Sequence, residues 1–76
     1  MMQPYRDIDG DSGVAAFESG PGFIRIQFED GGLYLYTEAS AGPVHIAQMK
    51  VLASRGDGLN AYITRHVRKA YERKER

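Results

Sequence analysis

The chain lacks cysteine and tryptophan, and none of its uninterrupted apolar runs is longer than four residues. The absence of cysteine excludes disulfide bridges, zinc ribbons and cysteine nucleophiles, so stability has to come from packing or from pairing with another chain. The short apolar runs exclude a transmembrane helix, and the first residues do not show the pattern of a signal peptide. We therefore expect a cytoplasmic protein that does not associate with a membrane.

Signs of catalysis are equally scarce. No serine lies in a nucleophile-elbow sequence, and no pair of carboxylates is placed for acid–base chemistry. His45 and His66 have no Cys, Asp or Glu partner at metal-ligand spacing. With 76 residues the chain can build one modest core that buries about 60–65% of its unfolded surface. We expect a single domain that is not an enzyme and needs no metal or cofactor.

The ten basic and ten acidic side chains are unevenly distributed along the chain. Residues 1–49 contain two basic and seven acidic residues, a net charge of −5, whereas residues 50–76 contain eight basic and three acidic residues, a net charge of +5. This asymmetry favours an anionic partner that approaches the C-terminal third and avoids the acidic first half.

Both ends of the chain are polar. Residues 1–13 show neither a helix nor a strand period, which predicts a flexible acidic lead-in. Residues 7–18 have the acidic spacing of a calcium loop, but Ser12 stands where the sharp turn calls for glycine, so a solvated segment is favoured over a calcium site. We expect residues 14–72 to form the domain and residues 73–76 to be a charged tail that frays.

Hydrophobic periodicity predicts the fold class. Residues 23–28 alternate apolar and polar side chains, as a half-buried strand does, and residues 14–19 and 33–37 are their expected partners. Residues 44–54 and 59–71 are expected to be helical. The sequence thus predicts an α+β fold, in which a small three-stranded antiparallel β-meander is followed by two α-helices packed on one face.

The register of the second hairpin decides where its tyrosines point. A two-residue turn pairs Ile26 with Leu35 and places Tyr34 and Tyr36 on the face opposite the isoleucines. A three-residue loop that ends in a left-handed Gly31 pairs Ile26 with Tyr34 instead, and moves both tyrosines to the isoleucine face. We favour the second register because glycine directly after aspartate suits the left-handed position.

Capping signals bound the two predicted helices. Pro43 suits the start of the first, with Ser40 or the backbone near it as the cap, and Asp57 can cap the second. The second helix has one apolar stripe, on which His66 is expected to be a core or boundary residue. The residues of this stripe are Leu59, Tyr62, Ile63, His66, Val67, Ala70 and Tyr71.

The opposite side of the second helix carries a row of basic residues. Rows of Lys and Arg bind the phosphate backbone of nucleic acids through counterion release, although many such rows are simply solvated. RNA binding is therefore one predicted function. The residues expected to carry it are Arg65, Arg68, Lys69, Arg73 and Lys74.

A protein partner or a homodimer is the alternative. In the favoured register Phe23, Leu33 and Leu35 lie on the sheet face that the helices do not cover. An exposed apolar strand surface of this kind is typical of an interface, so these three residues are the candidate interaction site.

Two short motifs resemble those of the KTSC domain, a small bacterial domain that occurs alone and at the C-terminus of some lysyl-tRNA synthetases. One is a central Tyr-x-Tyr after a strand and a glycine-containing turn, matched by Tyr34 and Tyr36. The other is a late aliphatic-Arg-x-x-Tyr, matched by Val67, Arg68 and Tyr71. The similarity extends over about residues 12–71.

This resemblance implies an α+β fold with Tyr34 and Tyr36 turned inward. It provides no catalytic residues, since the function of the family is not established. The occurrence of the domain in a tRNA synthetase implies RNA as a partner.

Overall fold

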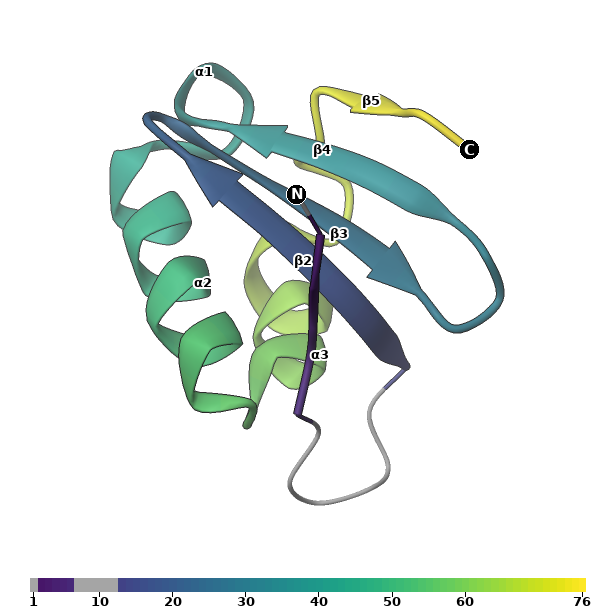
Figure 1. Cartoon of the computed structure of the whole chain (residues 1–76). Helices are drawn as coiled ribbons and strands as arrows, with labels where there is room; N and C mark the ends of the chain where they lie inside the picture. Colours follow the sequence, from purple (N-terminus) through teal and green to yellow (C-terminus); the bar gives the residue numbers. More distant parts are fainter. Residues whose placement is uncertain (1, 7–12) are drawn as a thin grey trace.

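The computed structural model describes residues 2–6 and 13–76, which form one antiparallel sheet with helices on one of its faces (Figure 1). The strands, in their order across the sheet, are β1 (Gln3–Pro4), β2 (Val14–Gly20), β3 (Phe23–Phe28), β4 (Leu33–Thr37) and β5 (Arg73–Lys74). The helices are α1 (Glu38–Ala41), α2 (Pro43–Arg55), α3 (Leu59–Tyr62) and η1 (Ile63–Val67), the last a π-helix. The α+β class and the three central strands are as predicted, whereas β1, β5 and α1 were not expected.

The hairpin between β3 and β4 has the predicted bulged register. Ile26 pairs with Tyr34 and Ile24 with Tyr36. Gly31 has a φ of +95°, the left-handed conformation that the three-residue loop requires. Both tyrosines therefore lie on the helix-covered face, beside the core. The fully buried core side chains are Val14, Ile24, Ile26, Tyr36, Ile46, Met49, Leu59 and Val67.

The first predicted helix is α2, with Pro43 at its first position. Its N-cap is Gly42, which has no side chain to form a cap, and Ser40 instead forms a capping box with Thr37 at the start of α1. The helix ends at Arg55, and the next residue, Gly56, has a φ of +74° that lets its amide reach the carbonyls of the last turn. Asp57 does not cap α3, so that part of the prediction is wrong.

The second predicted helix is shorter than expected. It begins at Leu59 as α3, continues as η1 and ends at Val67, so the helical prediction for residues 68–71 is wrong. The physical reason is tertiary: Tyr71 leaves the helix to pack edge-on against Tyr34 and Tyr36. The chain that follows then pairs with β4.

The described parts of both chain ends are held to the body of the domain. In the predicted lead-in, β1 pairs with β2, and Tyr5 is 6% exposed, its hydroxyl accepting from the Leu59 amide. The Arg6 guanidinium donates to the last carbonyls of α2, where a cation is favourable. Residues 7–12, and with them most of the calcium-loop pattern, lie outside the described residues.

The C-terminal residues, which were predicted to fray, are instead paired with the sheet. β5 pairs with β4, and the Leu33 amide donates to the Arg76 carbonyl at 3.0 Å. The Glu75 amide donates in turn to the Leu33 carbonyl at 2.6 Å. These backbone bonds satisfy groups that β4 would otherwise expose as an edge strand, which is why the polar tail is ordered against the sheet.

The apolar interaction face expected from Phe23, Leu33 and Leu35 is not exposed. Leu33 and Leu35 are only 9% and 6% exposed, and Phe23 is half-buried. Arg25, which is paired opposite Leu35, lies over the Phe23 ring. Its guanidinium forms ion pairs with the side-chain carboxylates of Glu18, at 2.9 Å, and of Glu75, near the C-terminus, at 2.6 Å. The expectation of an exposed patch is therefore wrong, because the C-terminal segment and the Arg25 side chain lie over this face.

Candidate functional site

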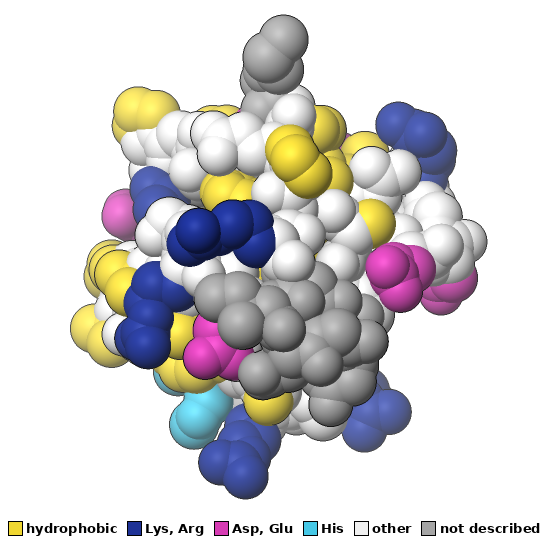
Figure 2. All heavy atoms as spheres, turned by 60° about the horizontal axis from the view of Figure 1, so that its bottom comes forward, with side chains coloured by type: hydrophobic (Ala, Val, Ile, Leu, Met, Phe, Trp, Pro, Cys, Tyr) yellow, Lys and Arg dark blue, Asp and Glu magenta, His cyan; other side chains and the backbone are white. Residues whose placement is uncertain are grey.

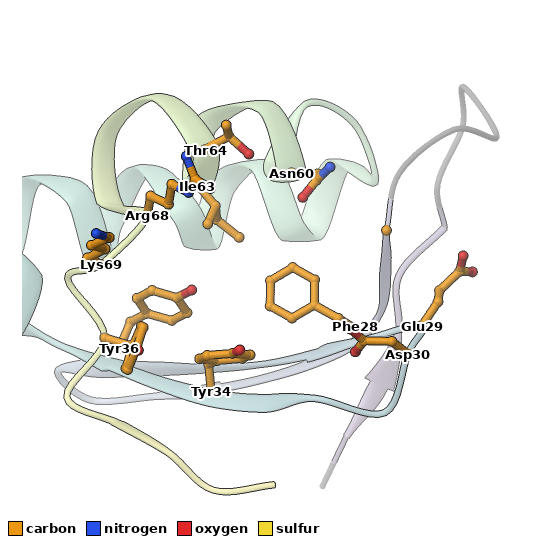
Figure 3. Close-up of a pocket in the computed structure, with 12 residues that line it drawn as sticks. Phe28, Glu29, Asp30, Tyr34, Tyr36, Asn60, Ile63, Thr64, Arg68 and Lys69 are labelled. Carbon is orange, nitrogen blue, oxygen red and sulfur yellow. The ribbon is translucent and has the colours of Figure 1, made fainter.

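A cavity of about 520 Å³ lies between the sheet and the α3–η1 segment (Figure 3). Its floor is formed by aromatic side chains of β3 and β4, and its roof by the helical segment. The volume falls within the range of about 300–1,000 Å³ that is usual for small-molecule sites. The lining residues are Gly13, Phe28, Glu29, Asp30, Tyr34, Tyr36, Asn60, Ile63, Thr64, Arg68, Lys69 and Tyr71.

The floor is an aromatic cluster built edge to face. The Phe28 and Tyr34 ring centroids are 5.5 Å apart, those of Tyr34 and Tyr71 are 4.9 Å apart, and those of Tyr36 and Tyr71 are 6.3 Å apart. Each pair meets at a steep angle, the arrangement that aromatic quadrupoles prefer. Tyr34 is half-buried and Tyr71 is 36% exposed, so part of the cluster remains accessible from the cavity side.

The two ends of the cavity carry opposite charges. Arg68 and Lys69 stand at the end where η1 gives way to a turn. Glu29 and Asp30 stand at the other end, on the β3–β4 loop, with the Phe28 and Tyr34 rings between the two ends (Figure 3). The cavity therefore has a positive end, a negative end and an aromatic centre.

Two local features of the sequence create this geometry. The bulged loop at Gly31 sets the register that turns Tyr34 and Tyr36 toward the helices. The π-helix η1 forms the roof through Ile63 and Thr64 and ends directly before Arg68. Such π-helical turns are rare, and they occur frequently at functional sites.

Burial changes the acidity of the deepest tyrosine. Desolvation, with smaller contributions from Tyr34 and Tyr71, raises the pKa of Tyr36 to about 12. This phenol is therefore neutral at physiological pH.

The structure brings together four residues of the two short sequence motifs. Tyr34, Tyr36, Arg68 and Tyr71 come from β4, the turn after η1 and the segment beyond it, and all four line the cavity. Lys69, from the predicted basic row, lines it as well.

The remainder of the predicted basic row is dispersed. Arg65 is exposed on η1 and does not line the cavity. Arg73 and Lys74 lie on β5, where Arg73 pairs with Glu75 and the Lys74 ammonium is 5.6 Å from the centre of the Tyr34 ring. The expectation of one basic helical face is wrong, because the helix ends before Arg68. Figure 2 shows Lys and Arg side chains as separate groups on the face in view, interspersed with apolar and neutral side chains.

Sequence reasoning also missed a second polar cluster. His45 Nδ1 and the Tyr62 hydroxyl are 2.6 Å apart, and the His45 and His66 rings stack with centroids 5.7 Å apart. His66 is exposed rather than a core residue, which corrects its placement on the apolar stripe. No sequence signal links these histidines, because they lie on different helices. Within residues 2–6 and 13–76, no group of three or more His, Cys, Asp or Glu side chains is placed to hold a metal ion.

No protein-family model, curated protein or solved structure matches the chain. The resemblance to the KTSC domain accordingly stays a prediction. No helix in the described part of the chain is long and apolar enough to cross a membrane.

Proposed function

We propose that this chain is a non-catalytic RNA-binding domain whose cavity receives one nucleotide of a single strand. The observation that carries the proposal is the meeting of the aromatic cluster with two adjacent cations in one cavity. The base stacks against Tyr34 and Tyr71, and the phosphate lies at Arg68 and Lys69.

The chemistry of single-stranded RNA supports this assignment. Unpaired bases stack on aromatic side chains, and Lys and Arg hold the backbone that follows. A base within a duplex presents no free face to such a cavity, so a single strand is the expected ligand. The cavity volume of about 520 Å³ accommodates a ligand the size of a nucleotide.

The composition of the cavity supports a binding role rather than a catalytic one. Among the described residues that line it, none is a His, Ser or Cys. Its deepest ionisable group, Tyr36, has a pKa of about 12, which keeps the phenol neutral. A general base needs a pKa near the working pH.

A matched pair of arginine variants tests the proposal. Arg65 and Arg68 are both exposed, but only Arg68 lines the cavity. With a labelled, unstructured RNA octamer at low salt, fluorescence anisotropy should show Arg68→Ala binding about tenfold more weakly, the usual cost of losing a charge-assisted hydrogen bond. Arg65→Ala should bind within about twofold of the parent protein. Equal losses in both variants, or no binding by the parent, would rule out the cavity as the RNA site.

A second pair of variants separates stacking from charge. Tyr71 lies outside any helix and is 36% exposed, so it is a suitable cavity aromatic to replace. Tyr71→Phe keeps the aromatic face and should retain binding, whereas Tyr71→Ala should lose roughly 1–3 kcal/mol of binding energy. Circular dichroism of both variants checks that the fold is intact.

A protein partner remains the second candidate, on a different surface from the one expected. The exposed large apolar side chains of the described helices are Val44, 78% exposed, and Val51, 48% exposed, seven residues apart on α2. Ala47 and Gln48 between them are exposed and uncharged. Light scattering at high concentration tests self-association through this face: a dimer mass that Val51→Lys reduces to that of a monomer supports it, and a monomer mass in the parent protein excludes it.

A further inference from the structure

The opposite charges at the two ends of the cavity determine how a nucleotide lies in it. The phosphate is attracted to Arg68 and Lys69 and repelled by the carboxylates of Glu29 and Asp30. With the phosphate at the cationic end and the base stacked on the central aromatic rings, the edge of the base faces the acidic loop.

The acidic end offers only hydrogen-bond acceptors from its side chains. One carboxylate oxygen of Asp30 accepts from the Gly32 amide at 2.8 Å, which fixes this side chain in the turn. The Glu29 backbone is held by its amide, which donates to the Gly13 carbonyl at 2.7 Å. Among the described residues its exposed carboxylate has no hydrogen bond or ion pair, so it is available to a ligand. An ionised carboxylate accepts hydrogen bonds and cannot donate them.

Cytosine and uracil differ at the position that such a carboxylate would read. Cytosine has an amino group at C4, which donates to Asp or Glu, whereas uracil has a carbonyl oxygen there, an acceptor. An acceptor turned toward a carboxylate gains no hydrogen bond and is repelled. The two rings have the same size, so the aromatic floor does not distinguish them.

We propose that the cavity selects nucleotides whose base presents an exocyclic amino group, and specifically prefers cytidine to uridine, through Glu29. This inference rests on the proposed RNA-binding function and adds to it the chemical class of base that is recognised.

Binding of labelled octacytidylate and octauridylate to the full chain tests the preference. At equal salt we expect the cytidine strand to bind roughly fivefold or more tightly, the lower end of what one specific base contact contributes. Glu29→Gln should bring the ratio close to one, because the amide nitrogen donates to the uracil carbonyl. The matched control is Glu38→Gln on α1, an exposed glutamate that does not line the cavity, which changes the net charge equally and should preserve the ratio.

The possible outcomes separate the two proposals. If both strands bind equally and Glu29→Gln changes nothing, the base preference is overturned while RNA binding stands. If neither strand nor free cytidine monophosphate binds at low salt, RNA binding and the base preference are both overturned. A cytidine preference that survives Glu29→Gln places recognition elsewhere and overturns the role of Glu29.

Competition by free cytidine monophosphate but not uridine monophosphate supports reading of a single base. Binding of that free nucleotide without binding of either strand keeps the preference but overturns the RNA assignment.

Discussion

At the scale of single residues, Tyr36 connects the cavity to the stability of the fold. It is 1% exposed, and its phenol lies among the rings of Tyr34 and Tyr71 at the base of the cavity. Burial stabilises the neutral phenol and penalises the phenolate, so the same side chain that forms the aromatic floor makes the fold sensitive to high pH.

The raised pKa of Tyr36 predicts a loss of stability in alkaline solution. The pKa is about 12 in the folded state against an ordinary value of 10.0, so between these values the unfolded chain releases a proton that the folded chain retains. The stabilising contribution is complete below pH 10 and disappears as pH rises to about 12, a change of roughly 2–3 kcal/mol. Urea unfolding at pH 9, 10 and 11 should therefore show a steeper decline for the parent protein than for Tyr36→Phe. Parallel declines would contradict the assigned pKa.

At the scale of secondary-structure elements, β5 determines which surface the sheet presents. It is only two residues long, yet its backbone bonds occupy the edge of β4, and Glu75 beside it reaches across the sheet to Arg25. The outer face that would have been an apolar interface thereby becomes a chain of ion pairs from Glu18 through Arg25 and Glu75 to Arg73.

The Arg25–Glu75 ion pair predicts that β5 docking is sensitive to acid. The hydrogen bond from Arg25, followed by that from Arg73, lowers the pKa of Glu75. Because the folded pKa lies below the unfolded one, this contribution is present above the ordinary carboxyl range and is lost as pH falls through the folded value. The thermal midpoint should therefore decline less between pH 6 and pH 3 in Glu75→Gln than in the parent protein. Glu38→Gln, on an exposed surface, should follow the parent curve; if it flattens the curve as much as Glu75→Gln does, the ion pair is not the cause.

At the scale of the whole molecule, the distribution of charge matters more than its total. The sequence places eight of ten basic residues after residue 49, but the fold disperses them over α2, η1, the following turn, β5 and the C-terminal residue. Only Arg68 and Lys69 of the described basic residues line the cavity. An RNA strand seated there therefore meets the two cations that line the cavity, with the Lys74 ammonium beside the Tyr34 ring as a third cation nearby.

This arrangement predicts a shallow dependence of RNA binding on salt. For single-stranded nucleic acids, the logarithm of the binding constant falls with the logarithm of the salt concentration, with a slope of about −0.7 for each phosphate neutralised. Two contacts therefore give a slope near −1.4, whereas five cations acting together give about −3.5. Anisotropy titrations from about 50 to 300 mM salt measure this slope. A slope steeper than about −3 would assign binding to the whole basic set instead of to the cavity.

Much of the fold could be derived from local patterns. The alternation over residues 23–28 and the glycine after Asp30 were sufficient for the central strands and the hairpin register, because both depend on neighbouring residues. Pro43 similarly marked the start of α2. The inward position of Tyr34 and Tyr36 followed from that register.

The sequence by itself therefore determined the β-hairpin, the first long helix and the separation of charge along the chain. The tertiary structure decided where the second helix ends and that β1 and β5 pair with the sheet. It also decided that Leu33 and Leu35 are buried, and that Arg68 and Tyr71 line the same cavity as the tyrosines of β4. Two-residue strands have no periodicity to detect, and the apolar spacing up to Tyr71 fits a continuous helix equally well. The cavity exists because contacts between residues more than thirty positions apart outweigh the local preference of residues 68–71 for helix, and such contacts form only once the sheet and helices have packed.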